Sequence, residues 1–178
     1  MRLGLFEHPD GVRADGPNEV VYDLSADEAH VAPAHVRGEA LRWALLDGDA
    51  RGALLAREID IDPAAGWLLR CDRVDFGPGG VAHLHTHPGP GIRCLLFGEI
   101  TIHSEGRVET FGPRQAWFER GPDPVLAVTS ADEPSAFARV MLVPAELEGK
   151  RTISYVDPAD ADKPKTQKAT IFSEIRVS

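Results

Sequence analysis

The sequence predicts an all-β protein, and three observations support this prediction. From residue 52 onward, short apolar segments alternate with turn signals at nearly regular spacing, which is typical of a β-sandwich or barrel. The 17 glycines and 14 prolines favour many turns over long helices. No apolar run approaches the ~20 residues of a membrane-spanning helix. We expect nine strands, at residues 53–60, 66–75, 81–87, 92–97, 99–104, 107–111, 115–119, 124–129 and 136–143.

Residues 1–50 are predicted to form an extended N-terminal arm with a short helix, packing on the barrel. Turn signals at Pro9-Asp-Gly and Gly16-Pro-Asn interrupt the arm. Ser25 and Glu28 have the spacing of a capping box, so a helix is expected over residues 26–31. Residues 38–46 fit a helix or a strand equally well.

The barrel is expected over residues 51–144, and residues 145–178 are expected to form a polar C-terminal tail. The tail has too little apolar surface for a second domain, so we expect one structural domain overall. It would cover the barrel or a partner subunit, with Ile171 and Phe172 as an anchor.

Charge and cysteine content limit the possible partners. The net charge of -9 argues against a nucleic acid or an anionic membrane as partner, since both require a basic face. The first residues lack the apolar core of a signal peptide, so a cytoplasmic protein is expected. Cys71 and Cys94 lie in apolar strand-like runs and are predicted to be buried free thiols.

Three histidines occupy alternate positions in one predicted strand: His83, His85 and His87. Successive side chains of a strand point to opposite faces, so the three imidazoles would share one face. Neutral imidazole is a common metal ligand, and two of them at this spacing can reach one ion. The pattern indicates a metal or proton-transfer site.

The surrounding spacing resembles the first motif of the cupin superfamily. Gly79, five residues, His85-Thr-His87, three residues, Gly91, six residues and Gly98 match that motif except at position 91, where it has a glutamate. A second motif around Gly121 is degenerate, with Pro124 where a histidine ligand would stand. The resemblance implies a single-domain cupin with an RmlC-like jelly-roll β-barrel, and His85 and His87 as its metal ligands.

A third protein ligand is needed, and the sequence offers His83 or Glu119. His83 lies about 13 Å from His87 along a straight strand at ~3.3 Å per residue, so it would join only if the strand bends or bulges. Glu119 shares a strand face with Trp117, which would form a wall of the substrate pocket. Otherwise Glu119 would pair with an arginine.

Arg93 follows the missing glutamate by two positions and is expected to point inward. A buried arginine needs an anionic partner. Arg93 would therefore bind a substrate carboxylate or enolate, or form an ion pair with Glu119; both remain open. Arg139, on a later strand, is expected to be exposed or at a subunit interface.

The resemblance implies a metal-dependent enzyme acting on a small anionic molecule, an Fe(II)-type dioxygenase or a related isomerase or lyase. Arg93 and Glu119 would be its catalytic residues and a divalent Fe, Mn, Ni or Zn its cofactor. One alternative is a non-enzymatic, metal-free cupin that binds a small ligand. Another is a metal-free epimerase or cyclase with a histidine base. The two arms and the exposed strand edges predict a homodimer.

Overall fold

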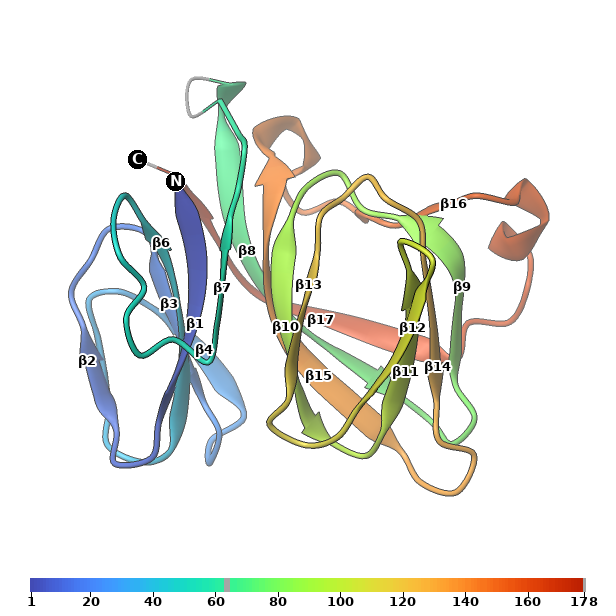
Figure 1. Ribbon diagram of the computed structural model, residues 1–178, viewed down its shortest axis with the longest axis horizontal. Helices are drawn as coiled ribbons and strands as arrows, with labels where there is room; N and C mark the ends of the chain where they lie inside the picture. Colours follow the sequence, from blue (N-terminus) through green and yellow to red (C-terminus); the bar gives the residue numbers. More distant parts are fainter. Residues whose placement is uncertain (63–64, 178) are drawn as a thin grey trace.

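The computed structural model describes residues 1–62 and 65–177. Their regular secondary structure is almost entirely β-strand, with loops and turns between the strands (Figure 1). The N-terminal sheet has the strand order β4-β3-β6-β1-β7. Its strands are β4 (Glu28–Val31), β3 (Glu19–Asp23), β6 (Ala40–Leu46), β1 (Arg2–His8) and β7 (Leu55–Glu58). A small second sheet joins β2 (Val12–Ala14) to β5 (Ala34–Val36).

Two further five-stranded sheets face each other. The first is ordered β13-β10-β15-β8-β17, with strands β13 (Ala116–Glu119), β10 (Gly91–Phe97), β15 (Ser135–Pro144), β8 (Trp67–Phe76) and β17 (Gln167–Arg176). The second is ordered β12-β11-β14-β9-β16, with strands β12 (Arg107–Phe111), β11 (Ile100–Ser104), β14 (Val125–Thr129), β9 (Val81–Thr86) and β16 (Ser154–Tyr155). Together they form an all-β barrel. All nine predicted strands are present, eight of them in the barrel and the first, β7, in the N-terminal sheet.

The helix expected over residues 26–31 is wrong. Asp23 Oδ1 accepts hydrogen bonds from the backbone N–H groups of Ser25 and Ala26 and from Ser25 Oγ. Asp27 then adopts a left-handed conformation with φ of 57°. These features make a tight turn between β3 and β4, so the Ser25 hydroxyl bonds backward to Asp23 instead of capping a helix. The ambiguous segment 38–46 holds strand β6.

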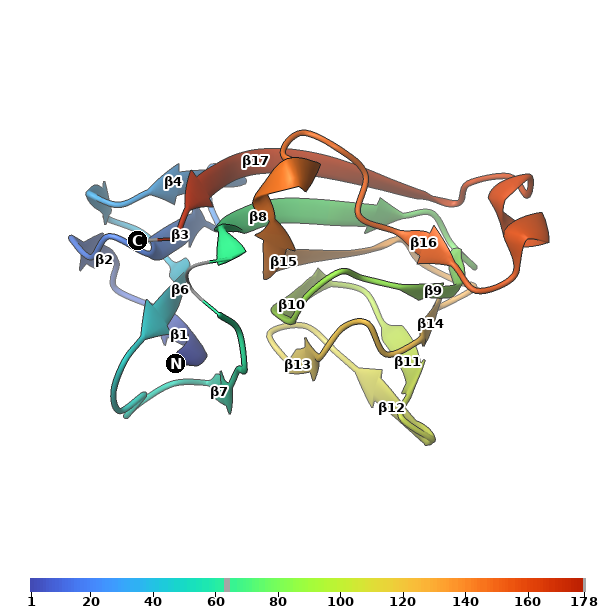
Figure 2. The same ribbon diagram turned by 90° about the horizontal axis from the view of Figure 1, so that it is seen from above.

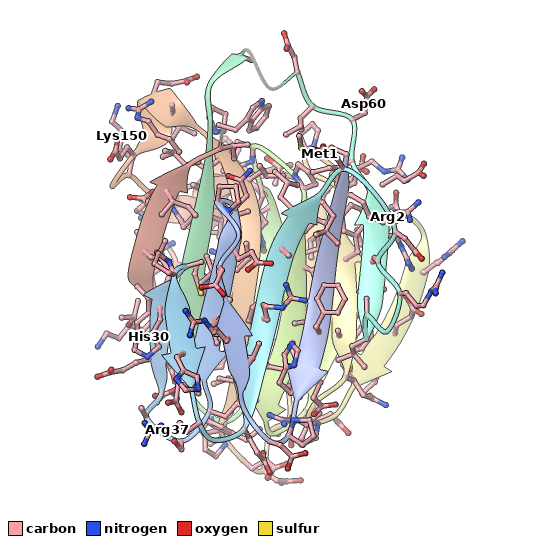
Figure 3. The ribbon with its side chains drawn as sticks, turned by 90° about the vertical axis from the view of Figure 1, so that its left-hand side faces the viewer. Met1, Arg2, His30, Arg37, Asp60 and Lys150 are labelled. Carbon is pink, nitrogen blue, oxygen red and sulfur yellow. The ribbon has the colours of Figure 1, made fainter. Side chains whose placement is uncertain are left out.

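The extended N-terminal arm is also wrong, because this segment forms a complete layer of the fold. Leu5, Tyr22 and Trp43 of the N-terminal sheet are fully buried in one cluster with Cys71 and Ile92 of the barrel. Trp43 Nε1 also donates a hydrogen bond to the Ile92 carbonyl, at 3.1 Å. Figure 2 shows the resulting order of N-terminal sheet, first barrel sheet and second barrel sheet. The outer side of the N-terminal sheet, with His30 and Arg37 near one end, is the view of Figure 3.

The central strand of the first barrel sheet, β15, is buried on two faces. In β15, Ala138, Val140 and Leu142 face the N-terminal sheet, while Phe137 belongs to the cluster inside the barrel. That inner cluster also contains Leu95 and other apolar side chains from both barrel sheets: Val74, Phe76, Ala82, Ile100, Ile102, Trp117, Val125 and Ala127. The barrel therefore has an apolar half, and its polar side chains gather in the remaining part.

The C-terminal segment returns to the barrel in two parts. Residues 145–166, which we call the strap, contain η2 (Ala145–Leu147), β16 and η3 (Pro158–Ala161) and pair with β9 through β16. Strand β17 then pairs with β8 along its length (Figure 2). Phe172 packs edge-on against Tyr22 with ring centroids 5.7 Å apart, so the tail touches both the barrel and the N-terminal sheet. In the described parts of the chain, no helix has the length and apolar character to cross a membrane.

Candidate metal and ligand site

A β-bulge in β9 decides which histidines enter the barrel. Val125 of β14 faces His85, whereas Ala127 faces Ala82, so β9 holds one extra residue between these pairs. His85 and His87 are consequently buried inside the barrel, at 5% and 4% exposure. His83 is displaced from this face, against the expectation that all three histidines share it. Its side chain is half-buried and does not line the cavity.

The two inward imidazoles present their unprotonated nitrogens to the same point. His85 Nδ1 lies 2.7 Å from the His83 carbonyl, and His87 Nδ1 lies 3.4 Å from the Thr152 carbonyl of the strap. A carbonyl only accepts, so each Nδ1 carries the proton and each Nε2 keeps its lone pair. The two Nε2 atoms lie 3.1 Å apart. Two acceptors at this distance repel unless a cation or a proton lies between them.

Burial keeps both imidazoles neutral. Desolvation is the main cause that lowers the pKa of His85 below its ordinary value. The pKa of His87 is lowered further, first by burial and then by the positive charges of Arg139 and Arg93. Protonation therefore does not relieve the repulsion between the lone pairs at neutral pH.

A carboxylate lies beside the position where the first motif lacks one. Gly91 of β10 pairs with Glu119 of β13, so the Glu119 side chain occupies the neighbouring strand on the inner face. Its Oε1 accepts a hydrogen bond from Trp117 Nε1 at 2.9 Å, and its Oε2 lies 3.7 Å from His87 Nε2. A Cβ on Gly91 would lie 2.7 Å from Met141 Cβ and 2.8 Å from both Arg93 Nη1 and the Val140 carbonyl oxygen. Strand β15 and Arg93 therefore leave no room for a side chain at position 91.

Arg93 is the counter-ion of Glu119. It is fully buried, its Nη2 lies 2.6 Å from Glu119 Oε2, and its Nη1 donates to the Gly91 carbonyl at 2.7 Å. The ion pair is not aligned as a hydrogen bond, which leaves Arg93 Nε and Nη2 and Glu119 Oε2 without one. Burial lowers the pKa of Arg93 to about 10, so the guanidinium stays charged at neutral pH. The sequence left two roles open for Arg93, binding a substrate anion or pairing with Glu119. In the structure Arg93 pairs with Glu119, and it does not line the cavity.

Arg139 lies in the site, so its expected position on the surface is wrong. It is only 7% exposed and binds Asp72 with two hydrogen bonds, Nε to Oδ1 at 2.6 Å and Nη2 to Oδ2 at 3.1 Å. Its Nη1 lies 3.3 Å from His87 Nε2. Asp72 was missed by sequence reasoning, although residues 70 and 72 alternate with the apolar residues 69 and 71 on β8. That alternation was the signal that two charged side chains enter the barrel.

These side chains surround a cavity of about 360 Å³ inside the barrel. His85, His87, Glu119, Asp72 and Arg139 line its polar part, and Trp117 lines it as expected. The strap and β17 form its outer edge. Arg70 of β8 anchors this edge, because its guanidinium donates to the Leu147 and Lys150 carbonyls at 2.8 Å each and also binds Glu174 of β17.

The donor atoms can be tested against a metal ion. Within residues 1–62 and 65–177, no group of three His, Cys, Asp or Glu side chains is already arranged to hold one. The histidine pair nevertheless fits, because nitrogens bonded to one ion at about 2.1 Å lie roughly 3 Å apart. Glu119 Oε2, buried and without a hydrogen bond, is the nearest oxygen donor to complete the set. His83 is not brought to this group.

Comparison with known proteins identifies the fold alone. No family model matches the chain, and no curated protein does. Among solved structures, an RmlC-like cupin from Shewanella frigidimarina is similar over 51% of this chain and 86% of its own, with 15% identity and a TM-score of 0.40. The polyketide cyclase RemF from Streptomyces resistomycificus is 22% identical, with a TM-score of 0.41, over 49% of this chain and 61% of RemF. An oxalate oxidase is 15% identical, with a TM-score of 0.39, over 82% of this chain and 81% of its own. These scores are too low to bear on function. The structure is thus a two-sheet β-barrel with an internal cavity that has a polar and an apolar part.

Proposed function

We propose that this chain is a metal-dependent cupin that acts on a small anionic molecule. The observation that carries the proposal is the convergence of the His85 and His87 Nε2 lone pairs, 3.1 Å apart, with each Nδ1 facing a carbonyl. Backbone acceptors behind ligating histidines are the usual means of fixing their tautomer and orientation. A divalent cation is the simplest partner for two such lone pairs in a buried cavity.

Glu119 would be the third ligand and would replace the carboxylate that the first motif lacks at Gly91. Two histidines and one carboxylate are the donor set of non-haem Fe(II) oxygenases, so an oxygenase is the reaction we favour over an isomerase or lyase. When bound, such an ion supplies a Lewis acid and open positions for substrate. Arg93 holds the Glu119 carboxylate in place, while Asp72 neutralises Arg139 next to His87.

A second candidate is a metal-free barrel that binds a small ligand. It is favoured by one observation, the Arg139 Nη1 donor 3.3 Å from His87 Nε2, which gives that lone pair a protein partner. The contact gives the His87 lone pair a partner, but it leaves the His85 lone pair opposite without one. The cytoplasmic location and the homodimer expected from the sequence stay predictions.

Metal content separates the two candidates. Untagged protein is incubated with Fe(II), Mn(II), Ni(II) or Zn(II), desalted and measured by elemental analysis. We expect about one ion per chain in the wild type and in His83→Ala, and none in the His85→Ala/His87→Ala double variant. His83→Ala is the matched control, because it lies on the same strand and keeps the backbone carbonyl that His85 uses. A wild type that takes up none of the four ions would refute the metal-dependent function.

A further inference from the structure

The cavity has an aromatic wall that the metal ligands do not use. Trp117 and Phe137 meet edge-to-face with ring centroids 5.3 Å apart, and Phe76 lies 6.0 Å from Phe137 at a tilt of 40°. All three rings line the cavity, together with apolar side chains from both barrel sheets. Rings in such an arrangement offer edges and faces to a further ring, which favours an aromatic ligand. One part of the bound molecule is therefore apolar and flat.

The charge around the cavity is opposite to that of the chain. The whole chain carries a net charge of -9, yet the cavity is lined by five basic and two acidic side chains. Both acidic side chains, Asp72 and Glu119, are paired with buried arginines, and Arg70 is paired with Glu174 of β17. The excess of positive charge therefore comes from Lys150, Arg151 and Lys165. A cleft with an excess of one charge attracts ligands of the opposite charge. The other part of the bound molecule is therefore anionic.

The strap supplies the basic side chains at the outer edge of the cavity, namely Lys150, Arg151 and Lys165. The ammonium groups of the two lysines donate to carbonyls within the strap. Arg151 is exposed and has no acidic partner among the residues that the structure describes. Its guanidinium is thus available to an incoming anion, and an exposed charge of this kind acts in a salt-dependent way.

The size of the cavity bounds the ligand. A dry cavity of about 150 Å³ holds one benzene molecule. On that scale a cavity of about 360 Å³ holds about fourteen non-hydrogen atoms. This allows one ring, or two fused rings, with an acidic group.

From the aromatic wall, the excess of positive charge and the volume, we propose that the cavity binds an aromatic carboxylate. Its ring packs against Phe76, Trp117 and Phe137, and its carboxylate is attracted by the basic residues, with Arg151 at the outer edge. Aromatic carboxylates would then be the substrate class of the proposed function, and their conversion rests on that function. Binding itself requires no metal ion, so the two can fail separately.

Binding is measured by isothermal titration calorimetry on the full chain, as purified and again after treatment with a chelator. The probes are benzoate, 2-naphthoate, the neutral isostere benzamide and the non-aromatic cyclohexanecarboxylate. We expect both aromatic acids to bind, benzamide to bind at least tenfold more weakly, and cyclohexanecarboxylate several-fold more weakly than benzoate. Equal affinity for benzoate and benzamide would refute the anionic part of the inference, and equal affinity for the two rings would refute the aromatic part.

Two pairs of variants place the probe in this cavity. Ala169, exposed on β17 at the cavity edge, becomes Trp to block it, and the adjacent exposed Thr170, which does not line the cavity, becomes Trp as the control. Arg151→Gln is compared with Arg107→Gln, an exposed arginine on β12. We expect naphthoate binding to be lost only in Ala169→Trp, and to weaken several-fold, with reduced salt dependence, only in Arg151→Gln. An equal effect of either control would overturn the placement. Metal uptake without binding of any aromatic acid would refute this inference and leave the proposed function standing.

Discussion

Replacing Glu119 by Gln removes the carboxylate that pairs with the fully buried Arg93. Glutamine keeps the shape of the side chain and an oxygen that accepts the Trp117 hydrogen bond. The change therefore isolates the charge of the pair, which lies at 0% and 7% exposure with an N–O distance of 2.6 Å. Unit charges about 4 Å apart attract by about 4 kcal/mol at an effective dielectric constant of 20. Breaking a buried pair on one side costs about 3–5 kcal/mol in mutational studies.

We expect Glu119→Gln to lower the free energy of unfolding by about 4 kcal/mol, and the melting temperature by about 10 °C. The assay is urea unfolding followed by circular dichroism, with a chelator present so that metal binding does not contribute. Glu109→Gln, at an exposed site on β12, is the matched control and should change the free energy by less than about 0.5 kcal/mol.

The Arg93→Met/Glu119→Gln double variant completes the test. It removes both charges, so it should be more stable than Glu119→Gln alone, because no unpaired buried charge remains. A loss below about 1 kcal/mol in Glu119→Gln would refute this reasoning. So would a double variant whose losses are simply additive, since the two groups would then be independent.

Three further outcomes test other parts of the structure. Arg70→Gln should loosen residues 145–166, so limited proteolysis should cut there faster while the barrel stays intact; an unchanged cleavage rate would contradict the anchoring role. Burial raises the pKa of both Cys71 and Cys94, that of Cys94 to about 12. At pH 8 a thiol reagent should therefore react with neither cysteine of the native protein, and with both only in denaturant. Gly98 has a φ of 81°, and an added Cβ would lie 2.5 Å from a backbone oxygen. Gly98→Ala should therefore cost at least about 1–3 kcal/mol in chemical unfolding, and a neutral effect would show that this turn relaxes.

The barrel strands were predictable from the sequence, whereas the N-terminal layer was not. Turn residues separate the strands after residue 52 cleanly, and every one of them formed. In the N-terminal part, the Ser25 and Glu28 spacing fits both a capping box and a tight turn. The turn is formed because Asp23 is placed to accept three hydrogen bonds from the following residues. The local sequence pattern does not distinguish the helix from the turn, because the turn also requires a neighbouring strand with which β4 can pair.

The site was predictable in its components and not in their placement. The spacing of the first motif indicated His85 and His87 and predicted that Arg93 points inward, whereas the direction of Glu119 was left open. The β9 bulge, which turns His83 away, inserts one residue and leaves no distinct mark in the sequence. Arg139 was misplaced because β15 was read as a strand with one exposed face. The apolar residues on both sides of Arg139 are typical of a strand covered on both faces, and an arginine in such a strand must be buried.

The two buried ion pairs are more readily explained by the site than by stability. Replacing a buried pair with apolar side chains of similar volume is often neutral or stabilising, so a barrel selected only to fold would not need them. Here Arg93, Arg139 and Asp72 are in register on the adjacent strands β10, β15 and β8, and Glu119 of β13 is opposite Gly91, two residues before Arg93. Each pair is close to neutral as a whole, but each directs one group at His87, the Glu119 carboxylate at 3.7 Å and the Arg139 guanidinium at 3.3 Å. The Glu119 carboxylate would hold a cation between the imidazoles, and the Arg139 guanidinium would hold an anion that binds beside this cation.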